Sequence, residues 1–222
     1  DAIGNLSVLL RGSTAWPINS AVTNPNFGNV FKWVRDSVHP FIYRGAMMDM
    51  TRGRFIEGAP STRDHSAGVL MMRSILPLID LAPAADADFI RSSVKYWELA
   101  ATESPYSYTM DSGASIADLK RINALLASAA PAAAEPQLSR VYPIMDQAVH
   151  LRPGFGFALA LYSDHTKSYE TINGQNFRGW YLNDGHTYLY NSDLKQYSDS
   201  YWATVDKYRL PGTTVDTRLL AN

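Results

Sequence analysis

The spacing of apolar residues changes once along this chain, and that change limits the folds open to it. In the first part, apolar side chains recur three or four positions apart, as on one face of a helix. After Gly154, large apolar residues alternate with glycine and alanine; the large ones are Phe155, Phe157, Leu159 and Leu161. This period of two predicts a strand packed on both faces. We therefore expect helices first and antiparallel strands second.

The helical part is predicted from a few apolar stripes. Three of them are Phe31, Val34 and Val38, then Ile90, Val94 and Trp97, and then Leu119, Ile122 and Leu126. Ser115 and Asp118 resemble a capping box at the start of the third helix, and Pro77 is expected to kink an earlier one. Leu138, Val141 and Met145 predict a short closing helix. The predicted domains are residues 1–147 and 148–222.

The second part carries turn signals between short apolar runs. Asn183-Asp184-Gly185 and Pro211-Gly212 are typical of turns. The run from His186 to Tyr190 alternates with period two, as in a strand. These signals predict an antiparallel sheet.

Composition excludes several classes of protein. The net charge is −1, so no overall field attracts a polyanion, and an acidic substrate would need a local cluster of cations. Nothing indicates nucleic-acid binding. No apolar run approaches the roughly 20 residues of a membrane span. The chain has no cysteine, which excludes disulfides and thiolate chemistry.

Five short sequence motifs in the second part resemble those of a known family. They are YETINGQN from Tyr169, RGWY from Arg178, DGHTYLYN from Asp184, YWATVD from Tyr201 and LPGTTVD from Leu210. Their order and spacing resemble the family 8 polysaccharide lyases, which include hyaluronate, chondroitin AC and xanthan lyases. An earlier segment, from Met48 to Arg54, resembles the same family's Met-Asp-Met-x-Arg-Gly-Arg motif.

The resemblance implies a fold and a reaction. The fold is α+β and multidomain: an incomplete α/α toroid of helices followed by the beginning of an antiparallel β-sandwich. The reaction is β-elimination at a uronic acid of an acidic polysaccharide, by a secreted enzyme that needs no cofactor. Hyaluronan is the first expected substrate, with chondroitin and xanthan close behind. The family's catalytic Asn, His and Tyr would precede Asp1, so the chain is expected to be a fragment completed by upstream and downstream parts of the enzyme.

Arg54 is the predicted catalytic residue of this chain, and Arg52 is predicted to bind substrate. The resemblance places Arg54 beside the catalytic tyrosine, where a cation would lower the tyrosine's pKa from about 10. Guanidinium also binds carboxylates through paired hydrogen bonds. That both arginines are merely ion-paired structural residues remains an alternative.

Four further residues are predicted to contact substrate: Asn173, Gln175, Asn176 and Trp180. Relatives usually carry Glu where Gln175 stands, which predicts an Arg54 that is less neutralised here. Gly58 stands where a second cleft arginine is common. Trp180 could stack on a sugar ring, although most such aromatics belong to a core.

The sequence shows no metal-binding motif and leaves one other class of function open. The five histidines show no paired spacing of zinc ligands, so no metal is predicted, and a structural calcium has no ligand motif. The main alternative function is a non-catalytic carbohydrate-binding or structural protein on the same scaffold.

Overall fold

The structure is a computed structural model, and it divides into two compact units. It describes residues 2–13, 18, 25–57, 63–101, 107–110, 113–198, 201–215 and 218. The first unit comprises residues Asp1–Ala46 and His65–Ala134, and the second comprises Met47–Asp64 and Glu135–Asn222. The second unit therefore joins a short early segment to the later part of the chain.

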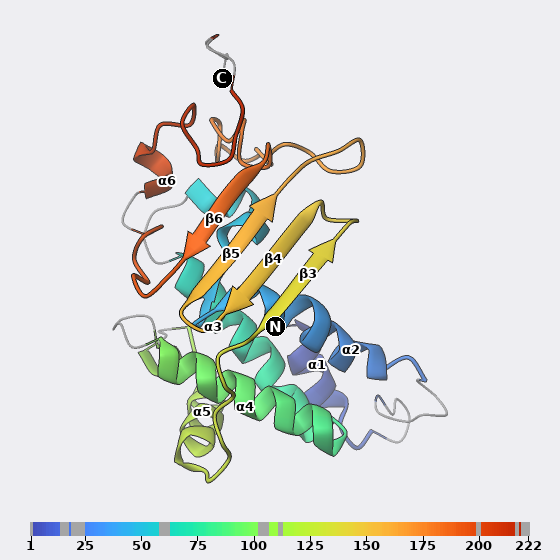
Figure 1. The fold of residues 1–222 in the computed structure, drawn as a ribbon. Helices are drawn as coiled ribbons and strands as arrows, with labels where there is room; N and C mark the ends of the chain where they lie inside the picture. Colours follow the sequence, from blue (N-terminus) through green and yellow to red (C-terminus); the bar gives the residue numbers. More distant parts are fainter. Residues whose placement is uncertain are drawn as a thin grey trace. The chain divides into compact units, whose positions relative to one another are not determined.

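The first unit is built from helices, coloured blue to green in Figure 1. Its α-helices are α1 (Ala2–Leu10), α2 (Gly28–Trp33), α3 (Arg63–Ile75), α4 (Ala84–Ala100) and α5 (Ile116–Ala127). The hairpin of β1 (Ile42–Tyr43) and β2 (Ala46–Met47) follows the first two helices in the sequence. The predicted helical first part is confirmed.

The predicted stripe on α4 forms the centre of this unit. Ile90, Val94 and Trp97 are at most 1% exposed. Two glycines let other backbone approach closely: a Cβ on Gly68 of α3 would lie 1.9 Å from the carbonyl oxygen of Gly45, and a Cβ on Gly45 would lie 2.9 Å from that of Trp97. The backbone of the β1–β2 hairpin is therefore in direct contact with the backbones of α3 and α4.

Prolines mark the places where these helices become irregular. After α2, the chain continues as the π-helix η1 (Val34–Val38) and the 3-10 helix η2 (His39–Phe41), which contains Pro40. After α3, it continues as the 3-10 helix η5 (Leu76–Asp80), which contains Pro77. Proline lacks the N–H that an α-helix needs, so the change of helix type at Pro77 takes the place of the predicted kink.

Helix α5 begins at the predicted capping box. The Asp118 N–H donates to Ser115 Oγ at 3.1 Å, and the Ser115 N–H donates to Asp118 Oδ2 at 3.1 Å. Both bonds satisfy N–H groups that the first turn leaves without partners. The predicted capping box is confirmed. Of the predicted stripe Leu119, Ile122 and Leu126, Ile122 is buried and the other two are partly exposed, and Leu125 is the second buried position. The other described short helix of the unit is η6 (Tyr108–Met110).

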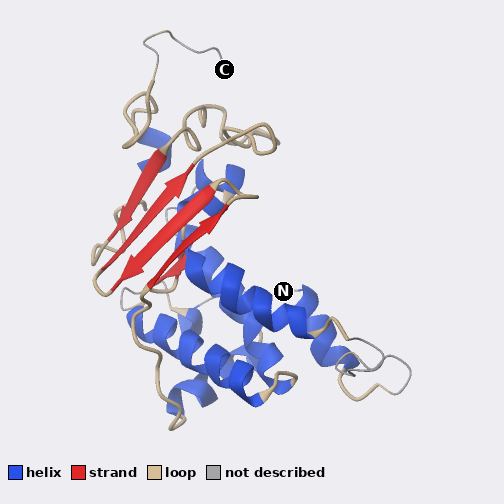
Figure 2. Cartoon of the chain, turned by 45° about the vertical axis from the view of Figure 1, so that its right-hand side comes forward, coloured by secondary structure: helices blue, strands red, loops and turns tan. Residues whose placement is uncertain are grey.

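The second unit contains a four-stranded antiparallel sheet, shown in red in Figure 2. The strands lie side by side in chain order: β3 (Leu138–Tyr142), β4 (Gln147–Arg152), β5 (Phe155–Ala160) and β6 (His186–Tyr190). The described short helices of this unit are η3 (Asp49–Thr51), η4 (Gly53–Glu57) and α6 (Tyr201–Thr204). The predicted antiparallel sheet is confirmed.

The predicted short helix at residues 138–145 is wrong, because this segment forms β3 and its turn. Leu138 pairs with Leu151 and Tyr142 pairs with Gln147 across the β3–β4 hairpin. The apolar spacing imitated a helix, but Val141 is 73% exposed, so the spacing reflects no buried helical face. The domain boundary predicted between residues 147 and 148 lies at the start of β4 and would separate β3 from its pairing partner.

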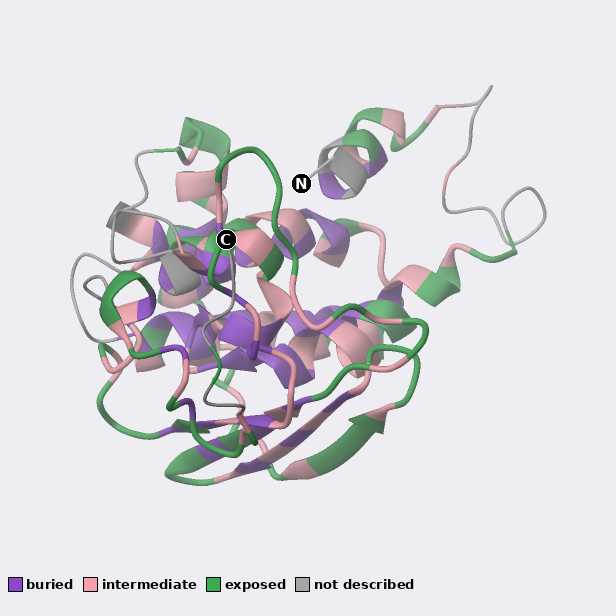
Figure 3. Ribbon diagram, turned by 90° about the horizontal axis from the view of Figure 1, so that it is seen from above, coloured by how far each residue is buried: buried purple, intermediate pink, exposed green. Residues whose placement is uncertain are grey.

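Strand β5 buries only one of its two faces, which corrects the expectation of packing on both. Ala158 and Ala160 are fully buried, whereas Phe157 is 38% exposed, and Figure 3 shows this alternation along the strands. The small residues lie beside large rings of β6: Ala158 pairs with Tyr188 and Ala160 with His186. Small side chains are therefore needed where aromatic rings fill the buried face.

Candidate functional site

Arg54 lies at the centre of a polar cluster within the second unit. Its Nη1 donates to Glu170 Oε1 at 2.8 Å, and its Nε donates to Gln175 Oε1 at 3.2 Å. Its backbone N–H donates to Glu170 Oε2 at 2.8 Å. One carboxylate therefore bridges the backbone and the guanidinium of the same residue, which fixes the position of the charge.

Gly53 makes this approach possible. It has φ +53°, and a Cβ there would lie 2.1 Å from Glu170 Oε2. Any other residue would both strain the backbone and displace the carboxylate. The backbone N–H of Arg54 is the main reason that the pKa of Glu170 is lowered, with the guanidinium adding to it. Glu170 is therefore a carboxylate at neutral pH.

The Arg54 guanidinium keeps donors for another ligand. Its side chain is 23% exposed, and its Cζ lies 4.5 Å from the centre of the Phe55 ring. Among the described residues, hydrogen-bond partners reach Nε and Nη1 but not Nη2. A carboxylate arriving from solvent would therefore find unoccupied N–H groups on a cation already held in place.

A tight hairpin presents Gln175 to Arg54. Ile172 and Gln175 form an antiparallel bridge, with the Gln175 N–H donating to the Ile172 carbonyl at 3.2 Å. Between them, Asn173 has φ 55° and Gly174 has φ 74°, as in a type I′ turn. Asn173 is exposed at the tip, so it is placed to meet solvent or a ligand.

Asn176 is directed inward and supports the loop. It is 1% exposed, and its Nδ2 donates to the backbone carbonyl of Glu170 at 2.9 Å. A Cβ on Gly179 would lie 2.5 Å from that amide nitrogen. Asn176 therefore holds the segment that carries Glu170, and this position favours a supporting role over the predicted contact with substrate.

Arg52 belongs to a different, buried cluster. Its side chain is 6% exposed, and its Nη1 lies 3.3 Å from Oδ1 of Asp49, whose side chain is fully buried. Arg52 also donates to the backbone carbonyls of Phe55 and Ile56. These contacts favour the structural alternative for Arg52.

Asp49 is the centre of that buried cluster. Its carboxylate accepts hydrogen bonds from Trp202 Nε1 at 3.0 Å and from the Tyr190 hydroxyl at 3.2 Å. Its own N–H donates to the Tyr190 hydroxyl at 2.9 Å. Burial, followed by the negative charge of Asp49, raises the pKa of Tyr190 well above its ordinary value. Tyr190 is therefore a neutral hydrogen-bonding residue and not a base.

Trp180 packs on an aromatic neighbour. Its ring lies 5.6 Å from the ring of Tyr208, centre to centre, with a tilt of 46°. The indole is partly exposed. Stacking on a sugar stays a prediction, because the contact with Tyr208 accounts only for the packed side of the ring.

His186 and Lys207 are buried bases beside the Asp49 cluster. The His186 ring lies 4.0 Å from that of Tyr188, and burial lowers its pKa to about 4. Lys207 places its Nζ 5.2 Å from the Trp202 ring, and burial lowers its pKa to about 8. Within the described part of the chain, no group of three His, Cys, Asp or Glu side chains is arranged to hold a metal ion.

The site contains a carboxylate that was not predicted. The family resemblance implied that Gln175 leaves Arg54 less neutralised than in relatives; in the structure, Glu170 is the ionic partner of Arg54. Glu170 was missed although it stands inside the YETINGQN word. Gly53, between the two arginines, was the signal that a side chain approaches this backbone. Gly58 lies outside the described residues.

The described helices include none long and apolar enough to cross a membrane. Comparison with known proteins gives two matches to one family. Residues 2–96 match the N-terminal alpha-helical domain of polysaccharide lyase family 8, and residues 137–222 match its super-sandwich domain.

Three lyases match nearly the whole chain. A xanthan lyase from Bacillus sp. (strain GL1) is 44% identical over 97% of this chain, and a hyaluronate lyase from Thermasporomyces composti is 36% identical over 99%. The solved structure of the Streptomyces coelicolor A3 chondroitin AC lyase, in complex with chondroitin sulphate, covers 100% of this chain with a TM-score of 0.90 and 34% identity. The chain spans only 22%, 28% and 30% of these proteins, respectively.

These matches settle the fold class. The helical part corresponds to the family's alpha-helical domain, and the sheet is the start of its super-sandwich. Both the predicted fold class and the resemblance drawn from the sequence words are confirmed. The chain belongs to polysaccharide lyase family 8.

Proposed function

We propose that this chain is part of a secreted lyase that cleaves an acidic polysaccharide by β-elimination at a uronic acid. The observation that carries the proposal is Arg54, a cation fixed by Glu170 and Gln175 whose Nη2 is open to a further ligand. Membership of the family supplies the reaction class.

The chemistry needs a stabilised carbanion and no activated water. A base removes the proton from C5 of the uronate, the C–H electron pair forms the C4–C5 double bond, and the C4–O bond breaks. The leaving oxygen then takes a proton. We assign the base to no residue of this chain and expect it in a segment that precedes Asp1.

Arg54 would act on charge at two points of this reaction. Its open N–H groups would bind the uronate carboxylate, which makes the C5 proton more acidic. Its positive charge would also favour a nearby tyrosinate over tyrosine. Glu170 prevents the guanidinium from reorienting, so that the cation is in place before substrate arrives.

The remaining predicted residues divide between contact and support. Gln175 fixes Nε of Arg54, and Asn173 lies exposed at the tip of the same turn. We assign substrate contact to Arg54, Asn173 and Trp180, and support to Gln175 and Asn176. Arg52 is assigned to the buried cluster.

The test is formation of unsaturated uronate, followed by ultraviolet absorbance, in the full-length protein. Hyaluronan is tried first, then chondroitin and xanthan. Arg54→Ala is expected to lower kcat/KM by roughly 10²- to 10³-fold, as when one preorganised donor is removed from a developing negative charge. Arg209→Ala is the control, because this arginine is 86% exposed and pairs only locally with Asp206.

Two results would overturn the assignment. Product formation that is unchanged in Arg54→Ala would remove Arg54 from the reaction. Binding of these polysaccharides without any unsaturated product would favour the non-catalytic carbohydrate-binding alternative.

A further inference from the structure

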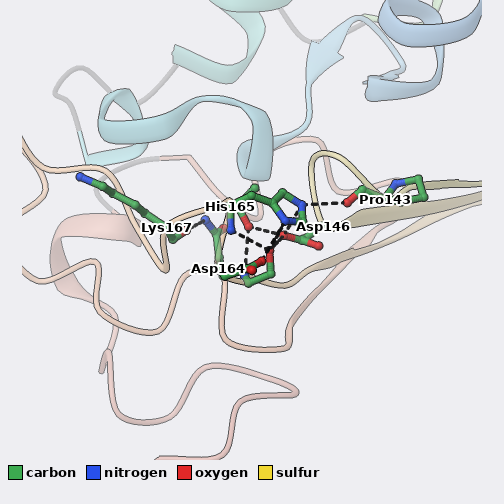
Figure 4. Close-up of polar contacts among 8 residues, drawn as sticks. Pro143, Asp146, Asp164, His165 and Lys167 are labelled. Carbon is green, nitrogen blue, oxygen red and sulfur yellow. Dashed lines mark hydrogen bonds and ion pairs between the residues drawn. The ribbon is translucent and has the colours of Figure 1, made fainter.

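A second polar cluster ties the loop after β5 to the turn between β3 and β4 (Figure 4). Asp146 lies in that turn with φ 50°, and its Oδ2 accepts hydrogen bonds from the hydroxyls of Ser163, at 2.6 Å, and Thr166. The Leu161 N–H donates to the Asp146 carbonyl at 2.8 Å. Asp146 directly precedes β4 and Leu161 directly follows β5, so this carboxylate ties the loop after β5 to the open end of the β4–β5 hairpin.

His165 completes the cluster with contacts on both ring nitrogens. Nε2 lies 3.2 Å from the Pro143 carbonyl oxygen and 3.4 Å from Asp146 Oδ2. Nδ1 lies 2.9 Å from Ser163 Oγ and 3.2 Å from Asp164 Oδ1. Ser163 already donates its hydroxyl proton to Asp146, so it can only accept from the ring.

This arrangement favours a protonated imidazole. A neutral imidazole has one N–H and one lone pair, whereas the imidazolium has two N–H groups. Both nitrogens of His165 face only acceptors among the contacts above. Loss of the proton would leave one ring nitrogen with a lone pair that faces an acceptor oxygen, unless the Ser163 hydroxyl turned its proton from Asp146 to Nδ1; in either case the cluster loses one of its contacts.

The charges around His165 agree with this reading. The carboxylates that face the ring are Asp146, from the β3–β4 turn, and Asp164, from its own loop. The Lys167 side chain extends away from the ring in Figure 4. The Pro143 carbonyl, then Asp164 and Asp146, raise the pKa of His165, and the hydroxyls of Ser163 and Thr166 lower that of Asp146.

We propose that His165 is a proton-operated clasp that holds the loop of residues 161–170 against the β3–β4 turn when the imidazole is charged and loosens it when the imidazole is neutral. The clasp is complete between the pKa of Asp146, below 3.8, and that of His165, above 6.5. It opens as pH rises through the pKa of His165, because the raised pKa means that the folded loop favours the charged ring.

The loop connects this clasp to the Arg54 site. Glu170 lies five residues after His165, and its carboxylate is the ionic partner of Arg54. A looser loop would hold Glu170 less firmly and would leave Arg54 less well positioned. Only this consequence for catalysis rests on the proposed function; the clasp itself does not.

The test is amide hydrogen exchange of residues 161–170 in the full-length protein, measured at pH 6 and pH 8.5 and corrected for the intrinsic effect of pH. Three proteins are compared with wild type. His165→Gln removes the charge, His165→Arg keeps a cation at every pH, and His150→Gln removes a histidine that lies on β4 and contacts Ser139.

Wild type and His150→Gln are expected to lose roughly two- to fivefold of their protection at the higher pH, which is the range for an exposed ion pair. His165→Gln should be poorly protected at both pH values, and His165→Arg should change little between them. The proposal is overturned if wild type shows no such loss, or if His165→Gln retains a loss of the same size. Because no substrate is used, failure here is separable from failure of the proposed lyase activity.

Discussion

Arg52 and Arg54 are separated by one glycine, yet they belong to opposite kinds of polar cluster. Arg52 is almost completely covered and pairs with the buried Asp49. Arg54 is partly exposed and pairs with Glu170, whose side chain is 49% exposed. The same residue type in the same motif thus stabilises the fold in one case and presents a charge to solvent in the other.

The difference lies in what surrounds each carboxylate. Asp49 is enclosed by the aromatic residues of β6 and α6, where a charge without partners would be costly. Glu170 lies on a surface loop, where water can replace a lost partner. We therefore expect changes at the Arg52 cluster to affect stability, and changes at the Arg54 cluster to affect activity.

The largest effect is expected from Arg52→Ala. Removing one partner leaves the Asp49 carboxylate buried and less compensated, at a cost of about 3–5 kcal/mol in the free energy of unfolding. Urea unfolding followed by tryptophan fluorescence measures it. The matched variant Arg54→Ala should lose less than about 1 kcal/mol, as is usual for an exposed pair. Equal losses in the two variants would remove the contrast between the clusters.

The second effect concerns stability at acid pH and tests the buried cluster around Asp49, beside which His186 lies. The pKa of His186 is lowered to about 4, against an ordinary value of 6.5. Between these two pKa values, His186 is protonated in the unfolded chain and neutral in the folded one. Its contribution to the free energy of unfolding is therefore complete above pH 6.5 and is lost between pH 6.5 and 4. The loss should reach about 3 kcal/mol.

Measurement of unfolding free energy across this range, in wild type and His186→Phe, checks that expectation. Phenylalanine keeps an aromatic ring against Tyr188 but cannot be protonated. The variant should lose most of the pH dependence, whereas His150→Gln should keep it. A pH dependence that survives in His186→Phe would assign the acid sensitivity to other groups.

Much of this fold could be predicted from local sequence signals. The stripe on α4, the capping box of α5 and the turns of the sheet depend on residues a few positions apart, and all appear where expected. The segment from Leu138 misled because its spacing suits a helix, while the deciding interaction is pairing with β4. Pairing between strands is not visible in the spacing of one segment.

The site was predicted only in part, because local motifs show its residues but not their long-range contacts. The Met-Asp-Met-x-Arg-Gly-Arg motif identified Arg54, and the YETINGQN motif identified Gln175. In the structure, Arg54 Nε donates to Gln175 Oε1 at 3.2 Å. The ionic partner Glu170 is 116 positions from Arg54, and its approach depends on the backbone conformation of Gly53. The burial of Arg52 depends on Asp49 being enclosed by Tyr190 and Trp202, which no local pattern records.

The third effect comes from Gly53→Ala. The new Cβ would lie 2.1 Å from Glu170 Oε2, so the carboxylate must move away from Arg54. We expect activity to fall as far as in Glu170→Gln, together with about 1–2 kcal/mol of stability lost to the left-handed backbone conformation. Gly154→Ala is the control, because Gly154 has φ 91° and a Cβ there would meet nothing within 4 Å. It should lose stability and keep activity; loss of activity in both variants would mean that strain alone, and not the position of Glu170, explains the result.

The smallest effect is expected from Gln175→Glu, which places a second carboxylate beside Arg54. Nε would keep its hydrogen bond, so the loop should fold unchanged and the free energy of unfolding should differ by less than about 1 kcal/mol. The added negative charge would oppose a uronate carboxylate at Nη2, so KM should rise several-fold while kcat changes less. Steady-state kinetics at low and high salt measure this, because added salt screens the repulsion and should narrow the difference from wild type. A KM that falls instead would show that Arg54 does not bind the anionic group of the substrate, and the contrast between a structural and a functional arginine would have to be drawn from some other residue.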